Sequence, residues 1–418
     1  MVHKAAHTKI KGIYYLFLLV VVFLLSCKKP SPVKIGTVNG ATAVCLGEDS
    51  VVYTLNATEA VDYVLWTVPK EAEITSGQGT GTITVKFGRV PGNICAILYN
   101  DGEPVSENAC LNVSFGVAGK WCRETNFQPG GRSSAMSFSI GKKGYISTGF
   151  SNSGLNGTTE IFNDLWQYDT ENSSWTQLAP LPDTPRIAAA CFTIGNKAYL
   201  GTGFRGAGSS PDNFFNDFWE YDSDANTWAP LPSIPGPVRQ YAFAFSIGNK
   251  GYVGGGQLGL SQLLTDFYEF NPATGTWLQK NDFPYPRISS VSFSIGNKGY
   301  IGTGQNGNAT FFYNDFYEYD PVTDSWAPKA SFPGAVRFSA EGFASNSKGY
   351  VGLGYSNAAA YNDFWEYNPV TDTWSQLPGL SQMRGNAMGF AVDNKVYLGM
   401  GNVTSSNVLN DWWVYTLN

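Results

Sequence analysis

One arginine recurs in each of six similar segments in the second part of the chain, and these arginines are candidates for anion binding. A guanidinium group grips a carboxylate in bidentate geometry, so a ring of such groups would attract an acidic ligand. The alternative is structural, with each arginine paired to an acidic neighbour or stacked on an aromatic ring. The six residues are Arg132, Arg186, Arg239, Arg287, Arg337 and Arg384.

Glu341 is the candidate general acid or base. It lies four residues after Arg337, at a position that is apolar in the other five segments. A carboxylate in such a place needs a charged or hydrogen-bonding partner, or its pKa rises. Groups with perturbed pKa values gather at catalytic sites, but a structural salt bridge is the other interpretation. The five apolar counterparts are Met136, Ala190, Phe243, Val291 and Met388.

Aromatic residues in the variable segments are candidates for ligand contact. Phe311 and Phe312 are adjacent in one such segment. Their rings could stack on sugar rings or fill space between neighbouring segments. The sequence leaves both roles open.

Several kinds of catalysis are excluded once an export signal is removed. The two histidines of the chain, His3 and His7, both lie within that signal. The mature chain therefore has neither a Ser-His-Asp or Cys-His nucleophile nor a histidine-ligated zinc or copper. The glycine-rich segments beginning at Gly201 and Gly302 are not followed by a helix, as a dinucleotide fingerprint requires. We expect no metal and no cofactor.

The N-terminus has the pattern of a bacterial export signal. Residues 1–26 combine a basic start with an apolar run over Ile13–Leu25, which is too short to span a membrane. Ser26 and Cys27 end this run in a pattern that resembles the lipobox of bacterial lipoproteins, which implies a lipid on Cys27. Residues 27–34 then read as a short tether. The resemblance implies an outer-membrane or cell-surface lipoprotein of a Gram-negative bacterium, facing the periplasm or exposed.

Charge and cysteine content narrow the partners of the mature chain. Loss of three lysines with the signal leaves 24 of the 27 basic residues against 33 acidic ones. This balance lacks the basic footprint of a nucleic-acid-binding protein. Outside the cytosol, Cys45, Cys95, Cys110 and Cys122 can form disulfides, although their spacing does not fix the pairing.

Residues 35–116 read as a small β-sandwich. Short apolar or alternating segments such as Val51–Leu55 and Thr82–Phe87 are separated by turn residues. The runs Trp66–Pro69 and Ile74–Thr80 resemble the PKD-like Ig-fold domains of bacterial surface proteins. The resemblance implies a spacing or presenting role.

The segments from 119 to 418 are repeats of about 50 residues. Each has a phenylalanine six residues and a tyrosine thirteen residues after its arginine, then an apolar pair led by an Asp, and the first five also have a tryptophan after that pair. The pattern resembles the kelch family, in which each repeat forms a four-stranded blade of a β-propeller. The resemblance places the arginine at the start of strand a. The last repeat lacks its tryptophan, and Trp121 at the front supplies one. We therefore expect an all-β protein with six blades, closed by strand 119–124.

The loop face of this propeller is the expected binding surface. The loops between strands b and c vary in length and share a face with the arginines near the channel mouth. We expect a membrane-anchored binding or adhesion protein that presents this face to a glycan or a protein ligand. The alternative is a sugar-modifying enzyme similar to kelch-type N-acetylneuraminate mutarotases, centred on Glu341 and one of Arg287, Arg337 or Arg384.

Overall fold

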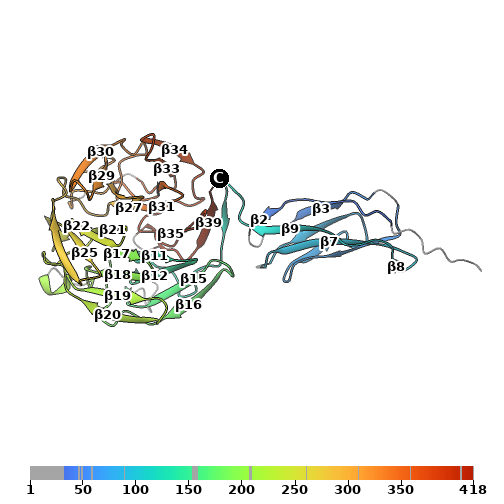
Figure 1. Cartoon of the computed structure of the whole chain (residues 1–418), viewed down its shortest axis with the longest axis horizontal. Coiled ribbons are helices and arrows are strands. Elements are labelled where there is room, and N and C mark those ends of the chain that lie inside the picture. The colour runs from blue at the N-terminus through green and yellow to red at the C-terminus, as the bar shows by residue number, and fades with distance from the viewer. Residues whose placement is uncertain are drawn as a thin grey trace, which may run out of the picture.

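The protein consists of a small β-sandwich followed by a six-bladed β-propeller (Figure 1). The computed structural model describes residues 33–45, 48, 50–57, 60–88, 90–152, 159–206, 210–259, 261–308, 310–357, 359–404 and 407–417. The predicted signal at 1–26 and Cys27 lie outside these residues. Within them, no helix is long and apolar enough to cross a membrane. The predicted all-β architecture is confirmed.

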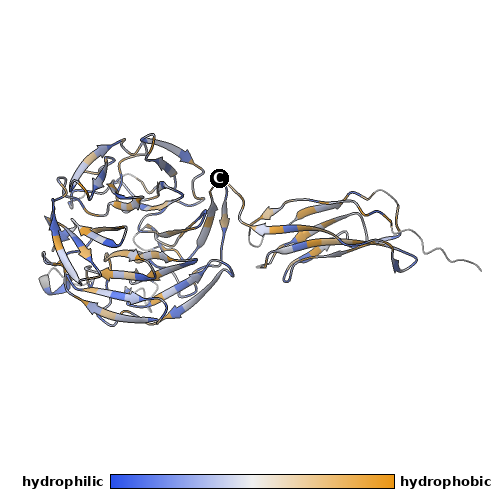
Figure 2. Ribbon diagram, in the orientation of Figure 1, coloured by the Kyte–Doolittle hydropathy of each residue, from blue (hydrophilic) through white to orange (hydrophobic). Residues whose placement is uncertain are grey.

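The sandwich is built from two sheets packed around one apolar core. The first sheet has the order β1 (Val38–Asn39), β3 (Val51–Leu55), β6 (Thr82–Lys86) and β5 (Glu73–Ser76). The second has the order β2 (Ala43–Val44), β9 (Ala109–Phe115), β7 (Gly92–Asn100) and β4 (Tyr63–Thr67), with β8 (Glu103–Pro104) added beside β7. Apolar and polar residues alternate along these strands, as the colouring in Figure 2 shows, and the apolar residues of each sheet face the other sheet. The buried residues include Tyr53, Trp66, Ile83, Ile94 and Leu98.

Each blade is an antiparallel sheet whose strands a to d run outward from the central channel. Blades one to three are β11 (Met136–Ile140), β12 (Lys143–Ser147), β15 (Leu165–Asp169) and β16 (Ser174–Leu178); β17 (Ala190–Ile194), β18 (Lys197–Gly201), β19 (Phe218–Asp222) and β20 (Thr227–Leu231); and β21 (Phe243–Ile247), β22 (Lys250–Gly254), β25 (Phe267–Asn271) and β26 (Thr276–Lys280). Blades four and five are β27 (Val291–Ile295), β28 (Lys298–Gly302), β29 (Phe316–Asp320) and β30 (Ser325–Lys329); and β31 (Glu341–Ser345), β32 (Lys348–Gly352), β33 (Phe364–Asn368) and β34 (Thr373–Leu377). Blade six is β35 (Met388–Val392), β36 (Lys395–Gly399), β39 (Trp412–Thr416) and β10 (Trp121–Arg123).

In the described residues, short hairpins and one turn of 3-10 helix lie in the loops between strands b and c. The hairpins are β13 (Phe150–Ser151) with β14 (Glu160–Ile161), β23 (Gln257–Leu258) with β24 (Gln262–Leu263), and β37 (Asn402–Thr404) with β38 (Asn407–Val408). The helical turn is η2 (Pro211–Asn213). All of these elements lie on the loop face, where variation leaves the blades intact.

Neighbouring blades pack through an aromatic ring of one blade that lies against a glycine of the next blade. The ring of Phe245 in blade three lies on Gly299 in blade four, where a Cβ atom would come within 2.3 Å of the phenylalanine ring. Phe192 meets Gly251 in the same way between blades two and three. A larger residue at these glycines would push the blades apart, because packed interiors leave no spare volume.

The ring closes through a strand that precedes the first blade in the sequence. Trp121 of β10 pairs with Tyr415 of β39 in antiparallel register. Its indole Nε1–H also donates to the carbonyl of Pro378, 2.8 Å away, at the end of blade five. Trp175 makes the equivalent bond to the carbonyl of Thr125 between blades six and one. Trp121 thus takes the structural place of the tryptophan that the last repeat lacks.

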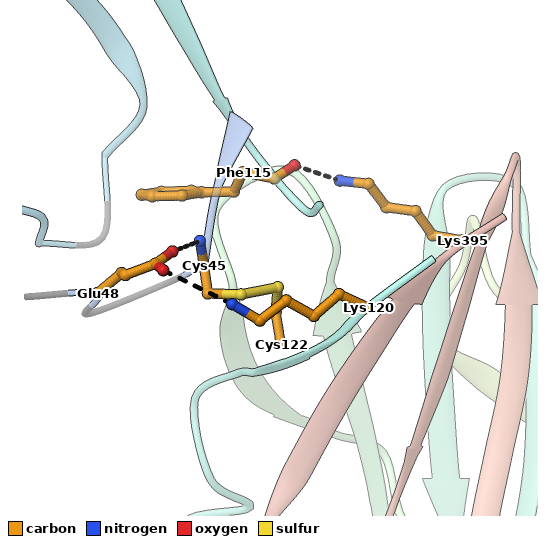
Figure 3. The surroundings of a disulfide bond; sticks show 6 residues. All are labelled: Cys45, Glu48, Phe115, Lys120, Cys122 and Lys395. Carbon is orange, nitrogen blue, oxygen red and sulfur yellow. Dashed lines mark hydrogen bonds and ion pairs between the residues drawn. A yellow bond between two sulfur atoms is a disulfide. The ribbon is translucent and has the colours of Figure 1, made fainter. Parts of the chain in front are cut away.

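The sandwich is attached at the outer edge of blade six (Figure 3). A disulfide joins Cys45, next to β2, to Cys122 in β10. Lys120 lies 3.6 Å from a carboxylate oxygen of Glu48, and the Lys395 ammonium donates to the carbonyl of Phe115 at 3.3 Å. Lys395 follows the turn between strands a and b of its blade. The sandwich therefore contacts the side of the propeller that carries these turns and not the loop face.

Candidate functional site

The six repeated arginines are buried between strands and form structural ion pairs. Their side chains are 0–1% exposed. In blade two, the Arg186 guanidinium bonds both carboxylate oxygens of Asp217 at 2.6 and 2.9 Å, and the carbonyl of Thr202 at 3.0 Å. Its guanidinium carbon lies 4.2 Å from the centre of the Phe215 ring. The pairs are Arg132–Asp164, Arg186–Asp217, Arg239–Asp266, Arg287–Asp315, Arg337–Asp363 and Arg384–Asp411.

This geometry favours the structural alternative for the arginines. Each one precedes strand a by four residues, so the expectation that it starts that strand is wrong. None of the six lines the cavities of the central channel in the described part of the chain. A bidentate Asp also occupies the donors that an anionic ligand would need. The arginines therefore have a structural role and are not free to bind an anionic ligand.

The central channel opens on the loop face in a cavity of about 150 Å³. Its rim is a ring of residues that follow the arginines by two positions and adopt a left-handed backbone with φ between 50 and 56°. Hydrogen bonds run around this ring from blade to blade, such as Asn386 N–H to the Ser339 carbonyl at 3.0 Å and Ser339 N–H to the Ser289 carbonyl at 2.9 Å. The ring residues are Ser134, Ala188, Tyr241, Ser289, Ser339 and Asn386.

Glu341 lines the central channel along much of its length. It borders the cavity at the loop face, the middle cavity of about 170 Å³ and the cavity of about 230 Å³ at the opposite end. The Ser137 hydroxyl donates to its Oε1 atom at 3.4 Å, across Gly389 of the intervening blade. A Cβ atom on Gly389 would lie 3.1 Å from Cγ of Glu341, so this glycine leaves the room that the carboxylate uses.

Burial raises the pKa of Glu341 to about 8, and hydrogen bonds from Gly389 N–H and Ser137 offset this only in part. The carboxyl group is therefore poised to exchange a proton near neutral pH, as acid–base chemistry requires. The predicted partners Arg287, Arg337 and Arg384 are bound to their own aspartates. The structure does not bring Glu341 together with a free arginine in the described residues.

Tyr241 is the channel residue that the sequence analysis missed. Its side chain lines the loop-face cavity with Glu341, and burial raises the pKa of its phenol. Within the described residues, its hydroxyl makes no hydrogen bond. The sequence did contain a signal, since a single aromatic residue stands at a position where the other repeats have Ser, Ala or Asn.

Phe311 and Phe312 lie on the loop face and outside the channel cavities. Phe311 is 59% exposed and meets the Tyr313 ring edge-on at 5.1 Å between centroids. Phe312 stacks on Phe338 at 5.3 Å and fills space between blades four and five. The two expected contact residues therefore differ in role: Phe311 is open to a partner, and Phe312 belongs to the packing.

The cysteines of the described chain add no reactive centre. Cys95 pairs with Cys110 inside the sandwich, and Cys45 with Cys122 across the two domains. The free thiol of Cys191 lines the channel, where burial raises its pKa and keeps it protonated. Among the residues that the structure describes, no group of three or more His, Cys, Asp or Glu side chains is placed to hold a metal ion.

Sequence profiles of known families match both domains. Residues 31–110 match the PKD-like domain, and residues 207–335 match the KLHDC2/KLHL20/DRC7 Kelch-repeats domain. The protein is a kelch-repeat β-propeller with an N-terminal PKD-like domain. The solved structure titled "Structure of YjhT" superposes with a TM-score of 0.58 at 17% identity, covering 71% of this chain and 99% of that one. At this identity the likeness establishes the kelch fold alone.

Curated relatives match this kelch propeller over about 120 residues. N-acetylneuraminate epimerase of Pasteurella multocida is 32% identical over 121 residues, which are 28% of this chain and 30% of the epimerase. Human Kelch repeat and BTB domain-containing protein 13 is 32% identical over 123 residues, 29% of this chain and 26% of the human protein. The matched stretch thus spans less than a third of the length of either relative.

Proposed function

We propose that this kelch protein is a lipid-anchored, extracytoplasmic binding protein that holds a small glycan-type ligand in the mouth of its propeller channel. The loop-face cavity carries the proposal. It is lined by four serines together with Asn386, Tyr241 and Glu341. Convergent polar groups of this kind beside an aromatic ring suit a hydroxylated ligand, because they pair its hydroxyls and stack on its ring.

The placement of the sandwich supports presentation of this face. The sandwich is bound at the turn side of blade six through Cys45–Cys122 and Lys395. In Figure 1 it extends from the propeller edge, and its first described residue, Val33, is bonded to Val105 beside β8 at the far end of the sandwich. A lipid on Cys27 would thus hold the propeller at the length of one domain from the membrane, at the outer membrane or cell surface.

A glycan array probed with the mature chain tests the binding function. We expect hits that are lost in Tyr241→Ala and kept in Phe311→Ala, since Tyr241 lines the channel cavity and Phe311 does not. Loss of the hits in Phe311→Ala with full retention in Tyr241→Ala would move the site to the loops. The absence of hits on sugars of any class would overturn the proposal.

The second candidate is a sugar-modifying enzyme. It is favoured by Glu341, whose raised pKa suits a general acid or base, and by the partial match to N-acetylneuraminate epimerase. The candidate is weaker because the arginines that would hold a sugar carboxylate are paired to aspartates. NMR of N-acetylneuraminate anomer exchange decides: acceleration that is lost in Glu341→Gln supports the enzyme, and a rate equal to that in buffer removes it.

A further inference from the structure

The channel holds one acidic group and, among the described residues, no basic side chain to balance its charge when it ionises. Among the described residues that line its three cavities, Glu341 is the one ionisable carboxyl, and no lysine or arginine is present. Among the described residues, Glu341 forms no salt bridge, and its carboxyl group accepts hydrogen bonds from the Ser137 hydroxyl and the Gly389 backbone N–H. An uncompensated buried carboxylate is unfavourable, so it is stabilised by any cation that reaches it.

The elements packed around Glu341 supply no counter-charge either. The neighbouring strands β27 and β35, and β11 beyond them, carry no titratable side chain. On β32 of the same blade, Lys348 and Tyr350 are both bonded to Glu366. The remaining titratable groups at the channel, the Cys191 thiol and the Tyr241 phenol, are neutral because burial raises both pKa values.

The same cavity offers two further groups that suit a cation. Tyr241 presents an aromatic ring, whose negative face attracts an ammonium group. Met136, which lines the same cavity from another blade, supplies a polarisable thioether. An anionic ligand would find neither a positive charge nor a free guanidinium in this cavity, because the arginines lie outside it and are paired.

We propose that the ligand of the channel carries an ammonium group, which pairs with Glu341 and lies against Tyr241. The natural class is an amino sugar or an amino alcohol, whose hydroxyl groups meet Ser289, Ser339 and Asn386 on the rim. This inference rests on the proposed function of the channel and adds the charge of the ligand to it.

Three hexoses that differ only at carbon six separate the possibilities. Glucose has a hydroxyl there, glucuronic acid a carboxylate, and 6-amino-6-deoxyglucose an ammonium group. We would titrate each into the full mature protein by calorimetry, in phosphate buffer, which brings no competing amine. We expect the amino sugar to bind about tenfold tighter than glucose, and glucuronic acid to bind weakest. The preference should grow as the pH rises toward about 8, because Glu341 then loses its proton.

Two substitutions test whether the preference for the amino sugar depends on Glu341. Glu341→Gln keeps the shape of the side chain and should reduce the preference for the amino sugar to less than about twofold. Glu366→Gln removes a carboxylate outside the channel on the same blade and should leave the preference unchanged. Thermal unfolding of both variants confirms that they are folded at the temperature of the titration.

The outcomes show separately whether the ammonium inference fails and whether the proposed binding function fails. Binding of glucose or glucuronic acid at least as tight as that of the amino sugar would overturn the ammonium inference and leave the channel as a sugar site. A preference that survives unchanged in Glu341→Gln would also overturn it. Failure of all three hexoses and of the glycan array would overturn the proposed function itself.

Discussion

Cys45 of the sandwich and Cys122 of β10 form a disulfide that ties the N-terminal domain to the strand closing the propeller. Cys122 lies between Trp121, which bonds to blade five, and Arg123, which pairs with Trp413 of β39. The cross-link thus holds both the junction of the two domains and the seam of the ring. Its two cysteines are 77 residues apart in the sequence.

Loss of this disulfide should destabilise the propeller. In the chain-entropy view, a cross-link over a loop of this size contributes roughly 4 kcal/mol to the free energy of unfolding. We expect Cys45→Ser to lower the urea midpoint of the propeller. Cys95→Ser, which breaks the bond inside the sandwich, serves as the control and should leave the propeller transition in place. An unchanged propeller midpoint in Cys45→Ser would show that the seam does not depend on the cross-link.

The pairing of these cysteines could not be predicted from the sequence, whereas the blades could. The blades follow from local signals that recur six times, such as Trp175 and its counterparts. The Cys45–Cys122 bond depends on how two separately folded domains meet, and nothing near either cysteine encodes that. The role of the six arginines could not be predicted for the same reason. Their repetition shows that they share a role, but it does not reveal that the partner of Arg186 is Asp217.

Arg186 should contribute to stability and not to ligand binding. Arg186→Ala leaves Asp217 as an unpaired carboxylate in a partly buried site, and breaking such a pair costs about 3 to 5 kcal/mol. Arg186→Lys keeps the charge but loses the bidentate bonds and should also lower the melting temperature. Titration of the folded lysine variant with the channel ligand should give the wild-type Kd. A weakened Kd with unchanged stability would restore the arginine ring as a binding surface.

Trp121 should stabilise the ring seam through its indole N–H. Trp121→Phe keeps an aromatic ring against Phe364 but leaves the Pro378 carbonyl without its donor. We expect a loss of about 1 kcal/mol in the free energy of unfolding. Trp175→Phe, at the next seam, offers a matched comparison and should lose a similar amount. No loss at Trp121 beside a clear loss at Trp175 would contradict the role assigned to the closing strand.

Glu341 should make stability fall as the pH rises. Its folded pKa of about 8 lies above the usual 4.5, so the native state holds an extra proton between these values. The unfolded state binds fewer protons there, and the free energy of unfolding therefore decreases with pH across that window. The glutamine in Glu341→Gln has no proton to lose. The free energy of unfolding of this variant should therefore rise relative to that of the wild type by on the order of 3 kcal/mol from about pH 5 to about pH 8. Parallel pH profiles for the two proteins would contradict this.

The channel site was only half predictable. Glu341 was found because it breaks an apolar pattern at one repeat position. Tyr241 breaks the pattern at another position, but that position has a meaning only once the left-handed ring around the channel mouth is known. Phe311 and Phe312 are the same residue type at adjacent positions. Their roles differ because the ring of Phe312 stacks on Phe338.

The direct test of the channel as the functional centre is the protonation of Glu341 with and without ligand. Carbon-13 NMR of the mature protein labelled at its glutamate carboxyl groups, with Glu341→Gln for assignment, follows this one group. We predict a carboxyl that titrates near pH 8 in the free protein and loses its proton at distinctly lower pH when 6-amino-6-deoxyglucose is bound. A Glu341 that titrates near 4.5, or whose titration is unmoved by saturating amino sugar, would contradict the account.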